Sequence, residues 1–204
     1  MSTLKEKLAT YDLKSLFEKK GYAFFTNGKY NVNIIGVRSD QGGKVTNKFD
    51  DYLVLDYNDE NGHQRKIWSI TTEPGAKLMK TPSNSKGTAI LVPGQYRGVY
   101  KVDIHNGKYK AVCQRNGTVK IYRDKNRDMV YDYNPGSIDT GWFGINIHRA
   151  DAGYTRSTID GYSAGCQVFN NPKEFAEFLS IVEKSKDIYG NKFTYTLIDE
   201  KDLV

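Results

Sequence analysis

Two side chains in the second half of the sequence could together carry out nucleophilic chemistry. Cys166 follows three small residues, 163–165, which let the backbone approach a ligand closely, and His148 lies eighteen positions before it. A neighbouring imidazole can lower the pKa of a thiol and take its proton, which makes the sulfur a nucleophile. The consecutive backbone N–H groups of Gly165 and Cys166 could hold the resulting oxyanion. A free cysteine is also often a small buried apolar residue, and the local sequence leaves that alternative open.

The segment 142–148 is predicted to be the strand that positions this histidine. Side chains alternate between the two faces of a strand, so one face of this segment would be apolar. The other face would be polar and would carry Trp142, Gly144, Asn146 and His148. A histidine at the end of a well-packed strand is held rigidly enough to serve as a catalytic base.

The remaining histidines and the second cysteine are predicted to have structural roles. His63 and His105 each lie beside an Asn-Gly turn, where solvated side chains are common. Cys113 lies inside the predicted strand 109–114 and is expected in the core.

One short acidic segment has the spacing of a weak calcium site. Asp124, Asn126 and Asp128 place oxygen side chains at alternate positions, as calcium loops do. The glycine and the glutamate of the EF-hand pattern are missing, and Lys125 and Arg127 interleave with the acids. A polar turn with internal hydrogen bonds is therefore favoured over a metal site.

The spacing around the histidine and cysteine resembles a known family. His148, fourteen intervening residues and then Ser-Ala-Gly-Cys at 163–166 resemble the signature of L,D-transpeptidase (YkuD-like) catalytic domains. The segment 143–148 is similar to the family's strand before its catalytic histidine, and 88–96 to its Thr-Pro-x-Gly-x-Phe/Tyr segment. The resemblance covers about residues 86–170, and the whole chain resembles phage-borne variants of the family.

The resemblance implies roles for individual residues. Cys166 matches the nucleophile and His148 the base, while the backbone carbonyl of Arg149 would orient the imidazole. Ser163 and Gly165 match the motif that shapes the turn. Two positions depart from the pattern, because Ala164 replaces the family's second histidine and Val168 its Asn or Arg; the histidine helps to hold the acyl donor. Weaker candidates for substrate binding are Asn146, Trp142, Tyr162, Arg149 and Arg156, and for the two arginines a solvated charge is slightly favoured.

The implied substrate is the stem peptide of peptidoglycan, and no cofactor is implied. A thiolate would attack an amide carbonyl and form an acyl-thioester, which water or an amine then accepts. The first twenty residues carry eight charged side chains and lack the apolar region of a signal peptide. We therefore expect a phage-type peptidase, made in the cytoplasm and delivered by the virion or at lysis.

Two other classes of function remain as alternatives. A non-catalytic wall-binding or virion structural module could keep the same fold, which Ala164 and Val168 favour. A nucleic-acid binder would suit the net charge of +6, but the basic residues are spread along the chain rather than clustered. Nucleic acid is therefore not expected as a partner, nor is a membrane span, because apolar runs are too short.

The elements around these residues predict a mainly β (α+β) fold. The chain has 204 residues, 13% of them aromatic, which favours one globular domain. We expect a transpeptidase-like β-sandwich or mixed sheet with two peripheral helices, at 3–20 and from 172 onward. Within the single domain 1–204, residues 1–85 would add a helix and extra strands, 86–170 the catalytic core, and 171–204 a last helix and strand.

Overall fold

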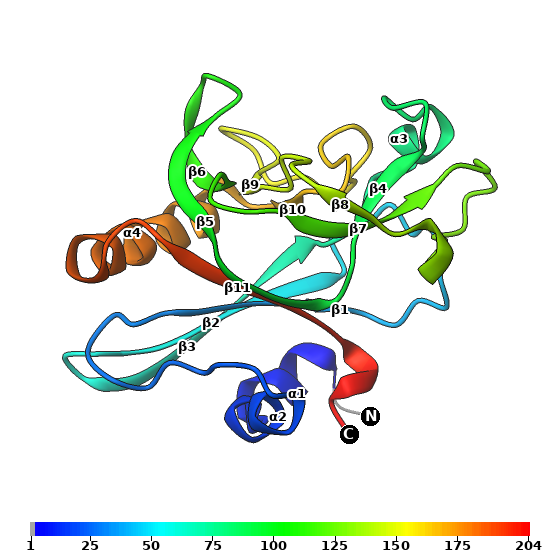
Figure 1. Cartoon of the computed structure of the whole chain (residues 1–204). Helices are drawn as coiled ribbons and strands as arrows, with labels where there is room; N and C mark the ends of the chain where they lie inside the picture. Colours follow the sequence, from blue (N-terminus) through cyan, green and yellow to red (C-terminus); the bar gives the residue numbers. More distant parts are fainter. Residues whose placement is uncertain (1–2) are drawn as a thin grey trace.

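Eight strands close into a barrel in the computed structural model, which describes residues 3–204 (Figure 1). Their order around the barrel is β1-β11-β5-β6-β9-β10-β3-β2, and a second sheet has the order β4-β7-β8. The strands are β1 (Asn33–Arg38), β2 (Asp51–Asp59), β3 (Gly62–Thr71), β4 (Thr88–Leu91), β5 (Gly94–His105), β6 (Tyr109–Gln114), β7 (Val119–Asp124), β8 (Asp139–Gly141), β9 (Ile147–Arg149), β10 (Gln167–Phe169) and β11 (Phe193–Asp199).

The two N-terminal helices and the long C-terminal helix pack on the barrel from two sides (Figure 1). Leu8, Leu13 and Phe17 of the two N-terminal helices are buried against β1, β2 and β11. Phe175 and Phe178 of the long helix join the main core cluster with residues of the barrel. The helices are α1 (Leu4–Thr10), α2 (Leu13–Lys20), α3 (Ala76–Lys80) and α4 (Pro172–Tyr189), with short 3-10 turns η1 (Pro135–Ser137) and η2 (Glu200–Asp202).

Local sequence signals explain several of these elements. The Asn-Gly pair at 61–62 joins β2 to β3 in an antiparallel hairpin, and Gly62 has a φ of +100° that other residues rarely adopt. Helix α4 begins with Pro172 directly after the cap Asn171, whose side chain accepts the N–H of Lys173. All six residues of β1 are buried, because the barrel core covers one face and α1 and α2 the other.

The mainly β architecture with peripheral helices is confirmed, and all three predicted segments contribute strands to one barrel. Two predicted elements are wrong in detail. The expected helix 3–20 is divided, since Asp12 accepts the N–H of Ser15 and starts a second helix after the extended Tyr11. The expected strand 142–148 is also interrupted.

Only Ile147 and His148 of that segment lie in a strand, because Gly144 has a φ of +68° and turns the chain. Its predicted polar face therefore does not form. Trp142 is 61% exposed, whereas Asn146 and His148 are 4% and 6% exposed. The histidine is positioned by the short parallel pair β9–β10 instead of by the end of a long strand.

Candidate active site

The pairing of β9 with β10 brings the segment of the histidine alongside the segment that follows the cysteine. His148 is the register partner of Val168, so Cys166 precedes that partner by two residues. Residues two apart on neighbouring strands share a face and lie within reach of long side chains. The Gln167 N–H donates to the Asn146 carbonyl at 2.9 Å, which fixes the segments that hold the two side chains.

One ring nitrogen of His148 has hydrogen-bond partners, and the other has none within residues 3–204. Its Nδ1 lies 2.9 Å from the Arg149 carbonyl and 3.4 Å from the Tyr109 hydroxyl, which itself donates to that carbonyl at 3.1 Å. A carbonyl only accepts, so Nδ1 must carry the proton and Nε2 is the basic nitrogen. Within residues 3–204, Nε2 has no hydrogen-bond partner. This tautomer is the one that a general base requires.

The sulfur of Cys166 contacts the segment that precedes the histidine. It accepts the Asn146 N–H and faces the Gly144 carbonyl, both at 3.4 Å. Burial raises the pKa of the Cys166 thiol to about 11, although the Asn146 N–H acts in the opposite direction. Burial also lowers the pKa of His148 to about 3, with a further contribution from His105. The resting pair is therefore a neutral thiol and a neutral imidazole.

His105 is a member of this site, contrary to its prediction as a solvated turn residue. It is 7% exposed, and its ring stacks on His148 with centroids 4.2 Å apart. The Asn146 amide nitrogen lies 3.0 Å from His105 Nδ1, while its oxygen accepts the buried Gln114 N–H at 2.9 Å. Because the oxygen is engaged in this way, the amide donates to Nδ1, so His105 Nδ1 is an acceptor and carries no proton. Burial lowers the pKa of His105, which agrees with a neutral ring.

The turn before the cysteine is built as the small residues suggested. The buried Ser163 hydroxyl donates to the Cys166 carbonyl at 2.8 Å and accepts the Gly165 N–H at 3.2 Å. Gly165 has a φ of +113°, and a Cβ there would lie 2.3 Å from the Ala89 carbonyl oxygen. The expected two-donor oxyanion hole is wrong in one respect, because the Gly165 N–H already donates to Ser163. Only the Cys166 N–H remains of that pair.

The weaker substrate candidates differ in their burial and in their contacts. Asn146 is buried and fixes His105, so it is a positioning residue of the site. The guanidinium of Arg149 lies 4.3 Å over the Tyr109 ring. Arg156 forms an ion pair with Asp151 and lies 5.6 Å from the Tyr162 ring centroid. Trp142 is largely exposed, and Cys113 is fully buried as expected.

The acidic segment after β7 forms a hydrogen-bonded turn. Asn126 donates to the carboxylates of Asp128 and Asp132 at 3.0 and 2.9 Å, and Asp124 accepts the Asp132 N–H at 3.0 Å. Within residues 3–204, no three His, Cys, Asp or Glu side chains are grouped so as to hold a metal ion. No helix in the same range is long and apolar enough to cross a membrane.

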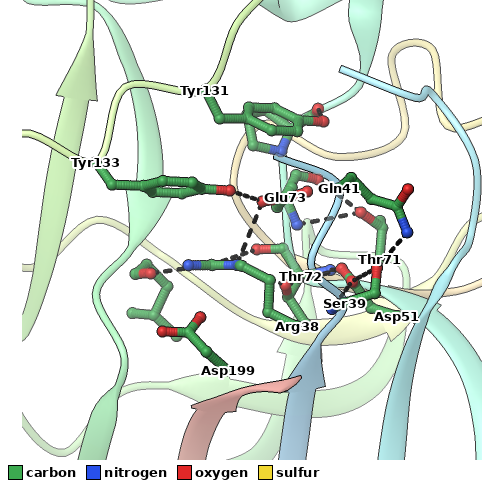
Figure 2. A network of polar contacts seen from close by, with 12 residues as sticks. Arg38, Ser39, Gln41, Asp51, Thr71, Thr72, Glu73, Tyr131, Tyr133 and Asp199 are labelled. Atoms are coloured by element: carbon green, nitrogen blue, oxygen red, sulfur yellow. Dashed lines mark hydrogen bonds and ion pairs between the residues drawn. The ribbon is translucent and has the colours of Figure 1, made fainter. Parts of the chain in front are cut away.

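A second cluster of polar side chains lies just beyond the C-terminal end of β3 and was missed by sequence reasoning (Figure 2). Arg38, Asp51 and Glu73 are each at least nine-tenths buried. Arg38 donates to Thr72 and to the Leu91 carbonyl, and its Nε lies 3.4 Å from Glu73 Oε1. The one signal available in the sequence was that the charged residue Arg38 stands at the end of an apolar run.

Arg38 and Glu73 of this cluster line a cavity of about 340 Å³, and neither Cys166 nor His148 is among the described residues that line it. Comparison of the chain with family models, with curated proteins and with solved structures found no match in any of the three.

Proposed function

We propose that the protein is a cysteine peptidase of the L,D-transpeptidase type, acting on peptidoglycan stem peptides through Cys166 and His148. The observation that carries the proposal is the tautomer of His148. Its Nδ1 proton is directed to the Arg149 carbonyl, which leaves a basic Nε2 on the strand next to the cysteine. The stem-peptide substrate, the phage-type assignment and the transpeptidase-like arrangement rest on the sequence motif at 148–166.

The reaction would start from the neutral pair. His148 Nε2 takes the thiol proton as Cys166 Sγ bonds to the carbonyl carbon of the scissile amide, and the Cys166 N–H stabilises the oxyanion. The C–N bond then breaks, and the imidazolium gives its proton to the leaving amine. Water attacks the acyl-thioester with His148 as the base, which releases the acid and restores the thiol.

A non-catalytic wall-binding or structural module on the same fold is the second candidate. The burial of the site favours it, because His148 is only 6% exposed and the pKa of the Cys166 thiol is raised to about 11. Substrate would have to reach a sulfur that now lies against the Gly144 carbonyl and the Asn146 N–H.

A muropeptide digest decides between the two candidates. Purified peptidoglycan and isolated tetrapeptide muropeptides are incubated with wild type, Cys166→Ala and His148→Gln, and the products are identified by mass spectrometry. We expect wild type alone to remove a terminal residue or open a cross-link. New dimers would identify an amine in place of water as the acceptor. Identical profiles for wild type and Cys166→Ala across several wall chemistries would exclude the peptidase and leave the module.

A further inference from the structure

The cavity beside Arg38 has the composition of a binding site for a small polar molecule. Its inner end is formed where β1 and β3 stop, by Arg38 and Glu73. Tyr131 and Tyr133 form a wall over these two side chains (Figure 2). A volume of about 340 Å³ lies within the range of small-molecule sites.

Both buried charged side chains have unused hydrogen-bonding atoms. Arg38 uses Nε and Nη2 for Thr72 and the Leu91 carbonyl, whereas its Nη1 has no partner within residues 3–204. Glu73 accepts the Tyr133 hydroxyl through Oε1, and its Oε2 has no partner in the same range. Arg38 Nη1 and Glu73 Oε2 are not fully enclosed by the protein, so both are accessible from the cavity that their residues line.

The charge balance of the cluster makes Glu73 a donor at neutral pH. Asp51 accepts two backbone N–H groups and two hydroxyls, from Ser39 and Thr72, which suits an ionised carboxylate. Asp51 acts on Arg38 as a nearby negative charge without contacting it directly. Burial, assisted by the negative charge of Asp51, raises the pKa of Glu73 to about 8 despite the opposing effect of Arg38. The inner end of the cavity thus presents N–H and O–H donors that match the two oxygens of a carboxylate.

The opening of the cavity has the opposite preference. Its charged residues are two acids and one base, Asp40, Glu200 and Lys201, whereas Asp199 lies beside Arg38 as its register partner. The excess of carboxylates favours a cation there. A molecule that satisfies both ends carries a carboxylate at one end and an ammonium group at the other.

We propose that this cavity binds a small zwitterion of the amino-acid class, with its carboxylate on Arg38 and Glu73 and its ammonium group at the acidic opening. The site does not depend on Cys166 chemistry, because its lining contains neither Cys166 nor His148. An experiment that disproves ligand binding in this cavity would therefore not disprove the proposed peptidase, and the reverse also holds.

Binding is tested with three probes of equal chain length. The full-length protein is titrated with 6-aminohexanoate, hexanoate and hexylamine while backbone amide shifts are followed by NMR. We expect 6-aminohexanoate to shift the amides around Ser39 and Glu73, and each single-charge probe to bind at least about tenfold more weakly. Equal binding of hexylamine, or no shift with any probe at tens of millimolar, would overturn the proposal.

The pH dependence tests the inner end of the cavity. Between pH 7 and 9 the 6-aminohexanoate amine stays charged, since alkylammonium groups titrate near 10.4, but Glu73 becomes a carboxylate that repels the ligand. We expect affinity to fall about tenfold over this range in wild type, given a Glu73 pKa of about 8, and not to change with pH in Glu73→Gln. The same fall in Glu73→Gln would contradict the assignment. The other ionisable or charged groups around Glu73 are Arg38, Asp51, Asp50, Tyr131, Tyr133 and Asp199.

A substitution at the opening avoids any risk of unfolding the buried cluster. Glu200→Gln removes one charge near the expected ammonium group, so 6-aminohexanoate should bind about two- to fivefold more weakly. Glu183→Gln on helix α4, outside the residues that line the cavity, is the matched control and should change nothing. Equal affinity in both variants would contradict the placement of the ammonium group.

Discussion

The imidazole rings of His105 and His148 stack with centroids 4.2 Å apart and planes 20° apart. His105 comes from the end of β5 and His148 from β9. Asn146, two residues before His148 in the chain, donates to His105 Nδ1. Two rings in such contact repel each other if both are protonated, so the stack favours neutral imidazoles. The acceptor role of His105 Nδ1 has the same effect, because protonation there would oppose the Asn146 N–H.

The first prediction is that the protein loses stability at acidic pH through His148. Burial lowers the pKa of His148 from 6.5 to about 3, so the unfolded state binds the proton first. This contribution to stability is complete above pH 6.5 and is lost as the pH falls towards 3. Urea denaturation should show the stability difference between wild type and His148→Gln shrinking by about 2–3 kcal/mol between pH 7.5 and 4.5. A constant difference would mean that the folded protein protonates His148 freely.

The second prediction concerns the reactivity of Cys166. Because burial raises the pKa of the thiol to about 11, iodoacetamide should react slowly at pH 7, and the rate should rise about tenfold per pH unit up to pH 9. Cys166→Ala gives the background from the fully buried Cys113. A plateau below pH 8.5 that disappears in His148→Gln would instead reveal a thiolate–imidazolium pair, and the reaction scheme would have to begin from that ion pair.

The third prediction concerns the two reasons why glycine is required near Cys166, which are a positive φ and the lack of space for a Cβ. Gly165→Ala places a Cβ against the Ala89 carbonyl, a backbone atom that cannot move aside, in addition to the strain of a positive φ. We expect a loss of about 3 kcal/mol or more in the free energy of unfolding. Gly144→Ala is the matched control, because Gly144 also has a positive φ but has open space around it, and it should lose only about 1–2 kcal/mol. Equal losses would mean that the turn relaxes away from β4.

Local signals in the sequence predicted the elements that are stabilised locally. The Asn-Gly turn at 61–62 and the apolar stripe of α4 depend on residues close in the chain, and both are present as expected. His148 and the residues directly after Cys166 likewise lie on neighbouring strands, β9 and β10, as their short spacing in the sequence allows. Closure of the barrel could not be predicted in this way, since it requires Ile34 of β1 to pair with Tyr195 of β11.

Residues whose role depends on distant partners were misjudged for the same reason. His105 beside an Asn-Gly turn has the sequence context of a solvated side chain, and its burial is produced by Asn146 and His148 from another part of the chain. Arg38 and Glu73 have the types of surface residues, yet their side chains are buried together where two strands end. Periodicity does not report such clusters, because it describes one element at a time.

The last prediction compares two fully buried tyrosines that touch each other. Tyr100 and Tyr195 make an edge-to-face contact with ring centroids 5.6 Å apart. The Tyr195 hydroxyl donates to Gln167 Oε1 at 2.7 Å, and Gln167 Nε2 in turn donates to the Gly165 carbonyl at 3.2 Å. Within residues 3–204, the Tyr100 hydroxyl has no partner. The two hydroxyls therefore differ in hydrogen bonding although both side chains are fully buried.

Tyr195→Phe leaves the buried Gln167 oxygen unsatisfied and should cost about 1–3 kcal/mol, whereas Tyr100→Phe removes an unpaired polar group and should be neutral or stabilising. Chemical denaturation of both variants measures the difference. Because Gln167 links Tyr195 to the turn before Cys166, Tyr195→Phe should also change the rate of Cys166 alkylation at pH 9, and Tyr100→Phe should not. Equal stabilities with equal alkylation rates would show that the Gly165 turn is held by Ser163 alone and that the barrel interior does not position the cysteine.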